Sequence, residues 1–280
     1  MTVPASAASA APSPASVVPA ASPSALSAAG VPDLGPAVRD LVGGGPELLF
    51  VTVSGAHLYG FPSQDSDVDL RGVHLLPLRE VIGLREGEPT RTRMWEREGL
   101  ELDLVTHDLL KFARLMLRRN GYVLEQVLSP LVVRTTAVHA ELAALAPGVV
   151  TAGHAHHYRG FATTQWRLHL RNGELKPLLY TFRVLLTGIH LMRTGRVLAD
   201  LPTLLAEVPE APAYLPDLIA AKAAAEHAPA PGLAPDRLLA DVEALHTTLS
   251  AAQGASALPA HPTAQDGLHD LVVRTREGAV

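Results

Sequence analysis

Two aspartates separated by one residue, Asp67 and Asp69, follow a glycine-containing turn and are the side chains best suited to metal chemistry in this sequence. Residues two apart on a strand point to the same face, so both carboxylates would lie side by side. Like charges this close repel each other unless a cation lies between them. Hard carboxylate oxygens suit Mg²⁺ or Mn²⁺. The spacing therefore predicts a divalent-metal site.

A third carboxylate, Asp103, lies in the alternating segment 100–105, which is typical of a strand. Its leucines would face one way, and Glu101 and Asp103 the other. Asp103 on a neighbouring strand would complete a site for two Mg²⁺ or Mn²⁺ ions, which clamp the attacking and leaving oxygens of a phosphoryl transfer. Glu101 is a spare carboxylate on the same face. The alternative is that these aspartates are solvent-facing positions of exposed strands.

The turn before the aspartates is suited to binding phosphate. The apolar, β-branched run 47–53 predicts a buried strand that stops at Ser54 and Gly55. A sharp turn at glycine exposes backbone N–H groups, which cradle phosphate oxygens well. Ser54, Gly55 and Ala56 are therefore candidate phosphate-binding residues. Arg71, on the face of Asp67 and Asp69, could contact phosphate or orient a carboxylate, and a structural ion pair is the alternative.

This segment resembles the signature of the DNA polymerase β nucleotidyltransferase superfamily, a Gly-Ser pair, a spacer and Asp-x-Asp. More narrowly, it is similar to the predicted nucleotidyltransferases of the RNA repair pathway. The residues that carry the resemblance are Ser54-Gly55, Tyr59-Gly60, Asp65-Ser66-Asp67, Asp69 and Arg71. Weaker matches over residues 47–190 are Asp103, Lys111-Phe112, Asn120, Glu125, Ser129-Pro130, Lys176, Tyr180 and Arg183.

The resemblance implies transfer of a nucleoside monophosphate from a triphosphate to an acceptor hydroxyl, with an RNA end as one candidate, and release of pyrophosphate. Asp67, Asp69 and Asp103 would be both the catalytic residues and the metal ligands. Ala56 departs from the family, which has serine there. Its missing hydrogen bond is worth about 0.5–1.5 kcal/mol. Two alternatives stay open: a catalytically degenerate protein that binds nucleotide or RNA, and a transferase that modifies a protein or a small molecule.

Later in the chain, Lys176, Tyr180 and Arg183 follow each other at steps of four and three, which places them near one helical face. Facing the site, Lys176 and Arg183 would bind the triphosphate and Tyr180 would stack on the base. A solvated basic face with a partly buried tyrosine is the alternative.

The region 154–196 has a local excess of positive charge. It holds one acidic residue, Glu174, and seven basic residues, so seven minus one leaves +6; the basic residues are Arg159, Arg167, Arg171, Lys176, Arg183, Arg193 and Arg196. With Tyr158 and Trp166 interleaved, this region could bind RNA or tRNA. Arginines that lay their stems along a helix pair would give the same pattern.

The fold class that these patterns predict is α/β (α+β): a small polymerase-β-like domain with a mixed sheet, followed by an all-helical domain. We expect a disordered Ala/Pro/Ser-rich tail over 1–35, the nucleotidyltransferase domain over 36–130, the helical domain over 131–252 and a flexible C-terminal tail over 253–280. Strands are predicted at 47–53, 66–76 and 100–105, and Thr106 as the N-cap of a helix at 107–119. Further helices are predicted at 137–146, 154–172, 178–194, 214–227 and 235–252.

The composition of the chain excludes some kinds of site and gives no sign of a membrane protein. The net charge of −5 does not by itself indicate a nucleic-acid binder, and the absence of cysteine excludes disulfides and thiolate metal sites. No apolar run approaches the roughly 20 residues that cross a bilayer, so no membrane association is expected. These features predict a cytoplasmic protein.

Overall fold

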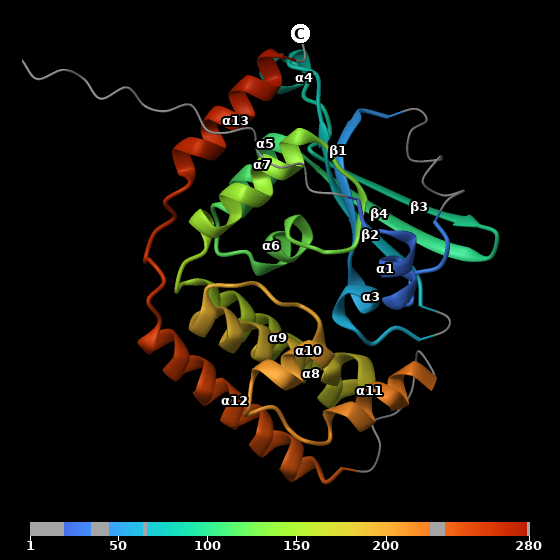
Figure 1. Cartoon of the computed structure of the whole chain (residues 1–280), viewed down its shortest axis with the longest axis vertical. Coiled ribbons are helices and arrows are strands. Elements are labelled where there is room, and N and C mark those ends of the chain that lie inside the picture. Colours follow the sequence, from blue (N-terminus) through green and yellow to red (C-terminus); the bar gives the residue numbers. More distant parts are fainter. Residues whose placement is uncertain (1–19, 35–44, 64–65, 225–232, 279–280) are drawn as a thin grey trace, which may run out of the picture.

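The computed structural model describes residues 20–34, 45–63, 66–224 and 233–278. A sheet with its covering helices forms one half of the molecule, and a bundle of helices forms the other half, below it in Figure 1. The predicted fold class, a mixed sheet followed by a helical part, is confirmed.

The sheet has five strands in the order β3-β4-β2-β1-β5. They are β1 (Glu47–Val53), β2 (Val68–Leu75), β3 (Thr90–Arg97), β4 (Leu100–Asp108) and β5 (Val132–Arg134). Strands β2 and β4 are parallel, and all other neighbours are antiparallel. The parallel pair lies in the middle of the sheet and carries two of the three predicted metal ligands, Asp69 and Asp103.

Helices of the first half cover one face of this sheet. They are α5 (Leu109–Met116), α6 (Gly121–Val127) and α7 (Ala137–Leu145), with the short helices α3 (Gly55–Tyr59) and α4 (Arg79–Ile82) at the strand ends. Phe50 of β1 joins two of them to the sheet. Its ring meets Phe112 of α5 edge-on at 5.5 Å and stacks on His139 of α7 at 4.3 Å. Such aromatic pairs add stability beyond the area they bury.

The helical half is built around α9 (Leu175–Thr194), which is apolar on most sides and buried along most of its length. Around it pack α8 (His154–Asn172), α10 (Leu201–Glu207), α11 (Leu215–Ala224) and α12 (Pro235–Ala255). A 3₁₀ turn, Ala146–Val149, connects the halves. Through the described ranges, no helix combines the length and the apolar character required to cross a membrane.

Both predicted tails contain ordered helix, so the predictions are wrong for the parts that the structure describes. Near the N-terminus, α1 (Pro23–Ala28) is capped by Ser22, and Val31 and Leu34 after it are buried. Residues 1–19 and 35 lie outside the described residues. At the other end, α12 runs to Ala255 and α13 (Gln265–Glu277) follows. Helix α13 buries Leu268 and Leu271, which are three residues apart and lie on one helical face.

Strands β3 and β5 were not predicted, and β4 was predicted too short. The segment 79–99 has no clear alternation, yet β3 forms there as an edge strand paired with β4. Strand β4 continues through Thr106 and His107 because both pair with β2. The helix cap is therefore Asp108, not Thr106, and its carboxylate accepts from the Leu110 N–H at 2.9 Å. Pairing between strands outweighs the capping tendency of threonine here.

Helix α13 is attached to the sheet half by a buried ion pair. Nη2 of Arg276 lies 2.6 Å from both carboxylate oxygens of Asp108, and the same guanidinium contacts the Leu76 carbonyl. Asp108 also accepts from the Leu76 N–H at 3.0 Å. Both members of the pair are buried. This contact closes a loop of 168 residues.

The buried pair should stabilise the fold far more than its exposed neighbour. We expect Arg276→Met to lower the free energy of unfolding by about 3–5 kcal/mol, because it leaves the Asp108 carboxylate buried without its cation. The matched control is Arg274→Met on the same helix, since Arg274 pairs with Glu141 at 2.8 Å in an exposed position. That change should cost at most about 1 kcal/mol. Urea unfolding measures both, and equal losses would contradict this role for α13.

Candidate active site

Two of the predicted ligands, Asp69 and Asp103, lie directly opposite each other on β2 and β4. Arg71 binds both. Its Nη2 donates to Asp69 Oδ1 at 2.6 Å and to Asp103 Oδ2 at 3.1 Å. Its Nη1 donates to the main-chain carbonyls of Leu70 and Asp103, each at 2.8 Å. One guanidinium therefore holds two like charges side by side, which would otherwise repel each other.

Each carboxylate keeps one oxygen that Arg71 does not use. Asp103 Oδ1 is buried and has no hydrogen-bond partner within the described part of the chain. Asp69 Oδ2 lies against the Gly55 backbone, where any side chain would overlap it. A buried carboxylate oxygen without a donor is costly unless a cation reaches it. These oxygens fit a hard divalent cation such as Mg²⁺ or Mn²⁺.

The third predicted ligand, Asp67, lies one residue before β2 and is exposed. It is near enough to affect Asp69. Burial raises the pKa of Asp69, Arg71 opposes that rise, and Asp67 and Asp103 add to it. Among the described residues, no three His, Cys, Asp or Glu side chains are already grouped as a metal site. The structure thus brings two ligands together and leaves Asp67 at the edge; Asp65 of the motif lies outside the described residues.

The glycine turn lies beside these carboxylates. Gly55 adopts a left-handed φ of 62°, which suits glycine, and it starts α3. The Ser54 N–H donates to the Asp69 carbonyl at 2.8 Å, so the turn and the carboxylate strand are joined. Ser54 Oγ is buried without a described partner, whereas Ala56 belongs to the apolar core. The hydroxyl that the turn offers is therefore that of Ser54.

Helix α9 presents two of its predicted residues to this site. Lys176 lies close enough to lower the pKa of Asp69, against the larger effect of burial. Tyr180 is half-buried, and its ring meets Tyr59 edge-on at 5.4 Å and Phe61 at 5.6 Å. Burial raises the pKa of Tyr180, Arg183 opposes this, and Asp69 adds to it. Lys176 and Tyr180 therefore lie within electrostatic range of the carboxylates.

Comparison with known proteins identifies the family of this chain. The model of the RNA repair pathway DNA polymerase beta family matches residues 38–274. The chain belongs to this family. It is also similar to an uncharacterized protein of Methanocaldococcus jannaschii, with 30% identity over 158 residues, or 54% of this chain. That match spans 63% of the archaeal protein's length.

In this member of the RNA repair pathway family, Arg183 does not reach the site, so its predicted contact with the triphosphate is wrong. Its side chain is 1% exposed and donates to Glu125 Oε1 at 3.1 Å. Its guanidinium also stacks 3.6 Å from the centre of the Tyr59 ring. The sequence spacing gave the correct helix, but Arg183 points into the interior. Its role is to join α9 to α6 and α3.

Two residues near the site were not predicted. Tyr122 of α6 lies beside Arg71. The pKa of Arg71 is raised, because the effects of Tyr122, Asp69 and Asp103 together exceed the lowering by burial. His57 of α3 is buried, and burial lowers its pKa against the influence of Asp67 and Asp69. His57 lies inside the recognised motif and could have been selected. Nothing in the spacing around Tyr122 indicates its position.

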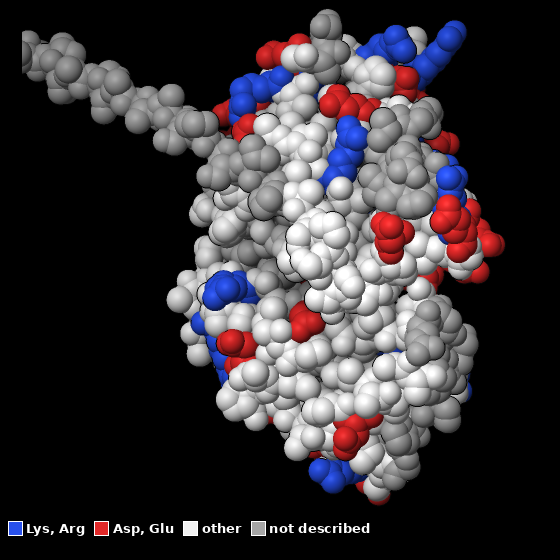
Figure 2. Space-filling model, turned by 45° about the vertical axis from the view of Figure 1, so that its right-hand side comes forward, with Lys and Arg blue, Asp and Glu red and all other residues white. Residues whose placement is uncertain are grey.

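The basic character of 154–196 is distributed rather than concentrated. Arg183 is buried, and Arg193 pairs with Glu210 at 2.6 Å. Arg167 and Arg171 are exposed on α8, but Tyr158 is fully buried and cannot stack on a base from outside. Figure 2 likewise shows basic side chains scattered over the described residues of the face that it draws.

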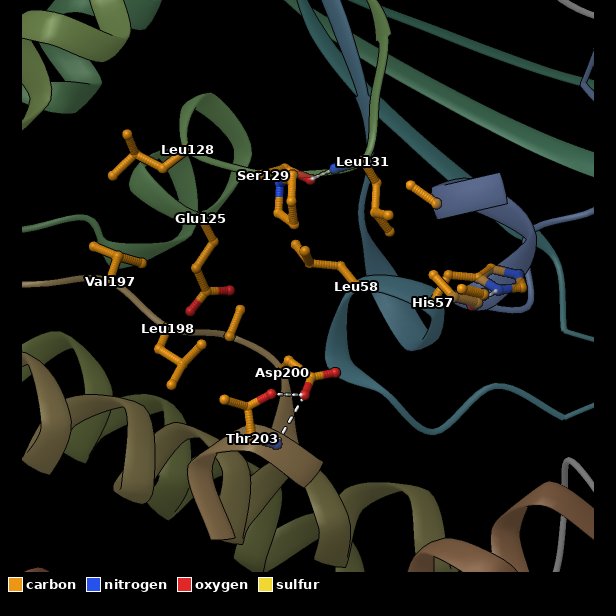
Figure 3. A pocket seen from close by; sticks show the side chains of 15 residues that line it. His57, Leu58, Glu125, Leu128, Ser129, Leu131, Val197, Leu198, Asp200 and Thr203 are labelled. Atoms are coloured by element: carbon orange, nitrogen blue, oxygen red, sulfur yellow. Dashed lines mark hydrogen bonds between the residues drawn. The ribbon is translucent and has the colours of Figure 1, made fainter. Parts of the chain in front are cut away.

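A cavity of about 450 Å³ lies beside α3 (Figure 3). Its lining is mostly apolar and comes from α1, α3, the end of α6, residues 128–131 and residues 197–203. Asp200 closes one side, where it accepts from the Thr203 hydroxyl at 2.6 Å and from the Thr203 N–H at 2.8 Å. Neither Asp69 nor Asp103 lines this cavity.

The closeness of Gly55 to Asp69 can be tested with a matched pair of glycines. Gly55→Ala forces alanine into a left-handed conformation and pushes a methyl group against Asp69 Oδ2. Gly99→Ala meets only the conformational strain, since Gly99 has a φ of 80° and open space around it. We expect both to lose about 1–2 kcal/mol of stability from strain, and only Gly55→Ala to weaken Mn²⁺ binding in calorimetry. Equal Mn²⁺ affinity in both variants would contradict the close approach.

Proposed function

We propose that this protein is a metal-dependent nucleotidyltransferase that moves a nucleoside monophosphate from a triphosphate to an acceptor hydroxyl. The acceptor oxygen would attack the α-phosphorus, the bond to the β-phosphate oxygen would break, and pyrophosphate would leave. The pairing of Asp69 and Asp103 beside the Gly55 turn is the observation that carries this proposal. Membership of a polymerase-β-like family supports the same reaction class.

The acidic residues would hold the metal. Asp69 and Asp103 offer the oxygens that Arg71 leaves, and Asp67 would complete the set from the end of its loop. We expect two ions, Mg²⁺ or Mn²⁺, which when bound would help deprotonate the acceptor hydroxyl and offset charge on the triphosphate. Arg71 would keep the two strand carboxylates aligned before any ion arrives.

The nucleotide would be bound by the turn and by α9. The first N–H groups of α3 have no partner inside the helix, and together with Ser54 Oγ they are suited to phosphate oxygens. Lys176 lies within electrostatic range of Asp69 and would contact the triphosphate. Tyr180 would stack on the base with its partly exposed ring.

For the acceptor, we favour an RNA end. The family is described by its place in RNA repair. The exposed arginines Arg167 and Arg171 on α8 offer charge for an RNA backbone, including that of tRNA. A protein or a small molecule as acceptor remains an outcome of the test below.

A second candidate function is nucleotide binding without transfer. Ala56 favours it, because the hydroxyl that the family places there is absent. The loss is about 0.5–1.5 kcal/mol for a neutral hydrogen bond and more to a charged phosphate. Binding of ATP in calorimetry, with no transfer to any acceptor, would support this candidate.

The transfer assay uses each α-³²P-labelled nucleoside triphosphate with Mg²⁺ or Mn²⁺, total RNA, tRNA and lysate protein. We expect label on RNA, and we expect Asp69→Asn and Asp103→Asn to lower the rate by at least about a hundredfold, since even outer-shell changes cost about 10–100-fold. Glu101→Gln is the control, because Glu101 shares the strand of Asp103 but is exposed at the hairpin end.

The molecule that carries the label distinguishes the possible acceptors. Label on protein or on a small molecule would change the acceptor and keep the reaction class. Transfer that survives Asp69→Asn and Asp103→Asn unchanged would contradict the proposed site.

A further inference from the structure

The loop that precedes β2 carries the ligand that the sheet does not fix. Asp69 and Asp103 are held on paired strands by Arg71. Asp67 lies before β2, so its position depends on the loop that begins at Gly60. A metal site is sensitive to displacements of well under an ångström in its ligands. What anchors this loop therefore matters to the whole site.

One anchor comes from a buried lysine in the helical half. Lys222 of α11 is fully buried, and its Nζ donates to Ser63 Oγ at 3.0 Å. Ser63 is tied in turn to Ser66: their hydroxyls lie 2.9 Å apart, and the Ser63 N–H donates to Ser66 Oγ at 2.9 Å. Ser66 directly precedes Asp67. The chain of contacts thus runs from α11 to the motif across 159 residues.

A second contact holds the start of the same loop. Gly60 has a left-handed φ of 79°, and any side chain there would overlap Asp200 and Pro202. These residues begin α10 in the helical half. The loop is therefore packed against that half at its first residue and hydrogen-bonded to it at Ser63. Gly60 and Ser63 are therefore positioned by contacts with the helical half.

We infer that Lys222 is a positioning residue, which holds Ser63, and through it Ser66, from α11 so that Asp67 lies beside Asp69. Placing an ammonium group in the interior is costly unless hydrogen bonds satisfy it, so a lysine here is a poor choice for packing alone. Its long side chain reaches from α11 to the Ser63 hydroxyl. This inference rests on the proposed metal site.

The test measures Mn²⁺ affinity of the full chain by calorimetry below the melting temperature. We expect Lys222→Met and Ser63→Ala each to weaken Mn²⁺ binding by about tenfold, the lower end of outer-shell effects. Their combination should be no worse than Lys222→Met alone, because both break one chain of contacts. Lys222→Arg should restore part of the affinity. Lys111→Met is the control, since Lys111 contacts Thr90 on β3 and not the loop.

If the natural sequence binds Mn²⁺ and both Lys222→Met and Ser63→Ala bind it with the same affinity, this inference is overturned but the proposed function is not. Equal weakening in Lys111→Met would also overturn it, because the effect would then be general. Absence of Mn²⁺ binding by the natural sequence would overturn both this inference and the proposed function. If Lys222→Met does not fold, Ser63→Ala decides, since it removes only a hydroxyl.

Discussion

Two carboxylates on adjacent strands of a half-buried sheet repel each other, and this repulsion is the constraint around which the molecule is arranged. Arg71 offsets this repulsion with its positive charge and donates four hydrogen bonds, two to the carboxylates and two to main-chain carbonyls. That arrangement requires β2 and β4 to be parallel and in one register, so that Asp69 meets Asp103. The antiparallel neighbours and the helices on one face then serve to keep this central pair in place. A guanidinium that spans both carboxylates also means that any metal must share them with Arg71.

The helical half contributes to the site as well as to the core. Helix α9 brings Lys176 and Tyr180 toward Asp69, and the buried pair of Arg183 with Glu125 fixes α9 against α6. Breaking a buried ion pair costs several kcal/mol, so this connection contributes strongly to stability. Helix α11 reaches the motif loop through Lys222. The two halves therefore act as one unit around the carboxylates, although their sequence patterns differ.

The sequence predicted the parts of the fold that depend on local periodicity. The alternation in 100–105 was recognisable because one face of β4 is buried, and the apolar run in 47–53 because β1 is buried on both faces. The long helices showed the helical spacing of their apolar residues. The edge strand β3 has little buried surface, so alternation could not reveal it. Helix α13 is anchored by Arg276 to a distant aspartate, and no local signal records such a contact. For the same reason, the spacing of Arg183 predicted its helix but not that its side chain points inward. No sequence signal indicated that Lys222 would bind Ser63.

The most direct test of the central claim is the position of a metal ion. A crystal of the protein soaked with Mn²⁺ and a non-hydrolysable nucleoside triphosphate would locate the ion by its anomalous scattering. We predict a peak within about 2.0–2.2 Å of oxygens of both Asp69 and Asp103, the usual range for this class of cation, with Arg71 still bonded to the opposite side of the pair. Mn²⁺ bound only elsewhere, with the carboxylates and Arg71 unchanged, would contradict the account.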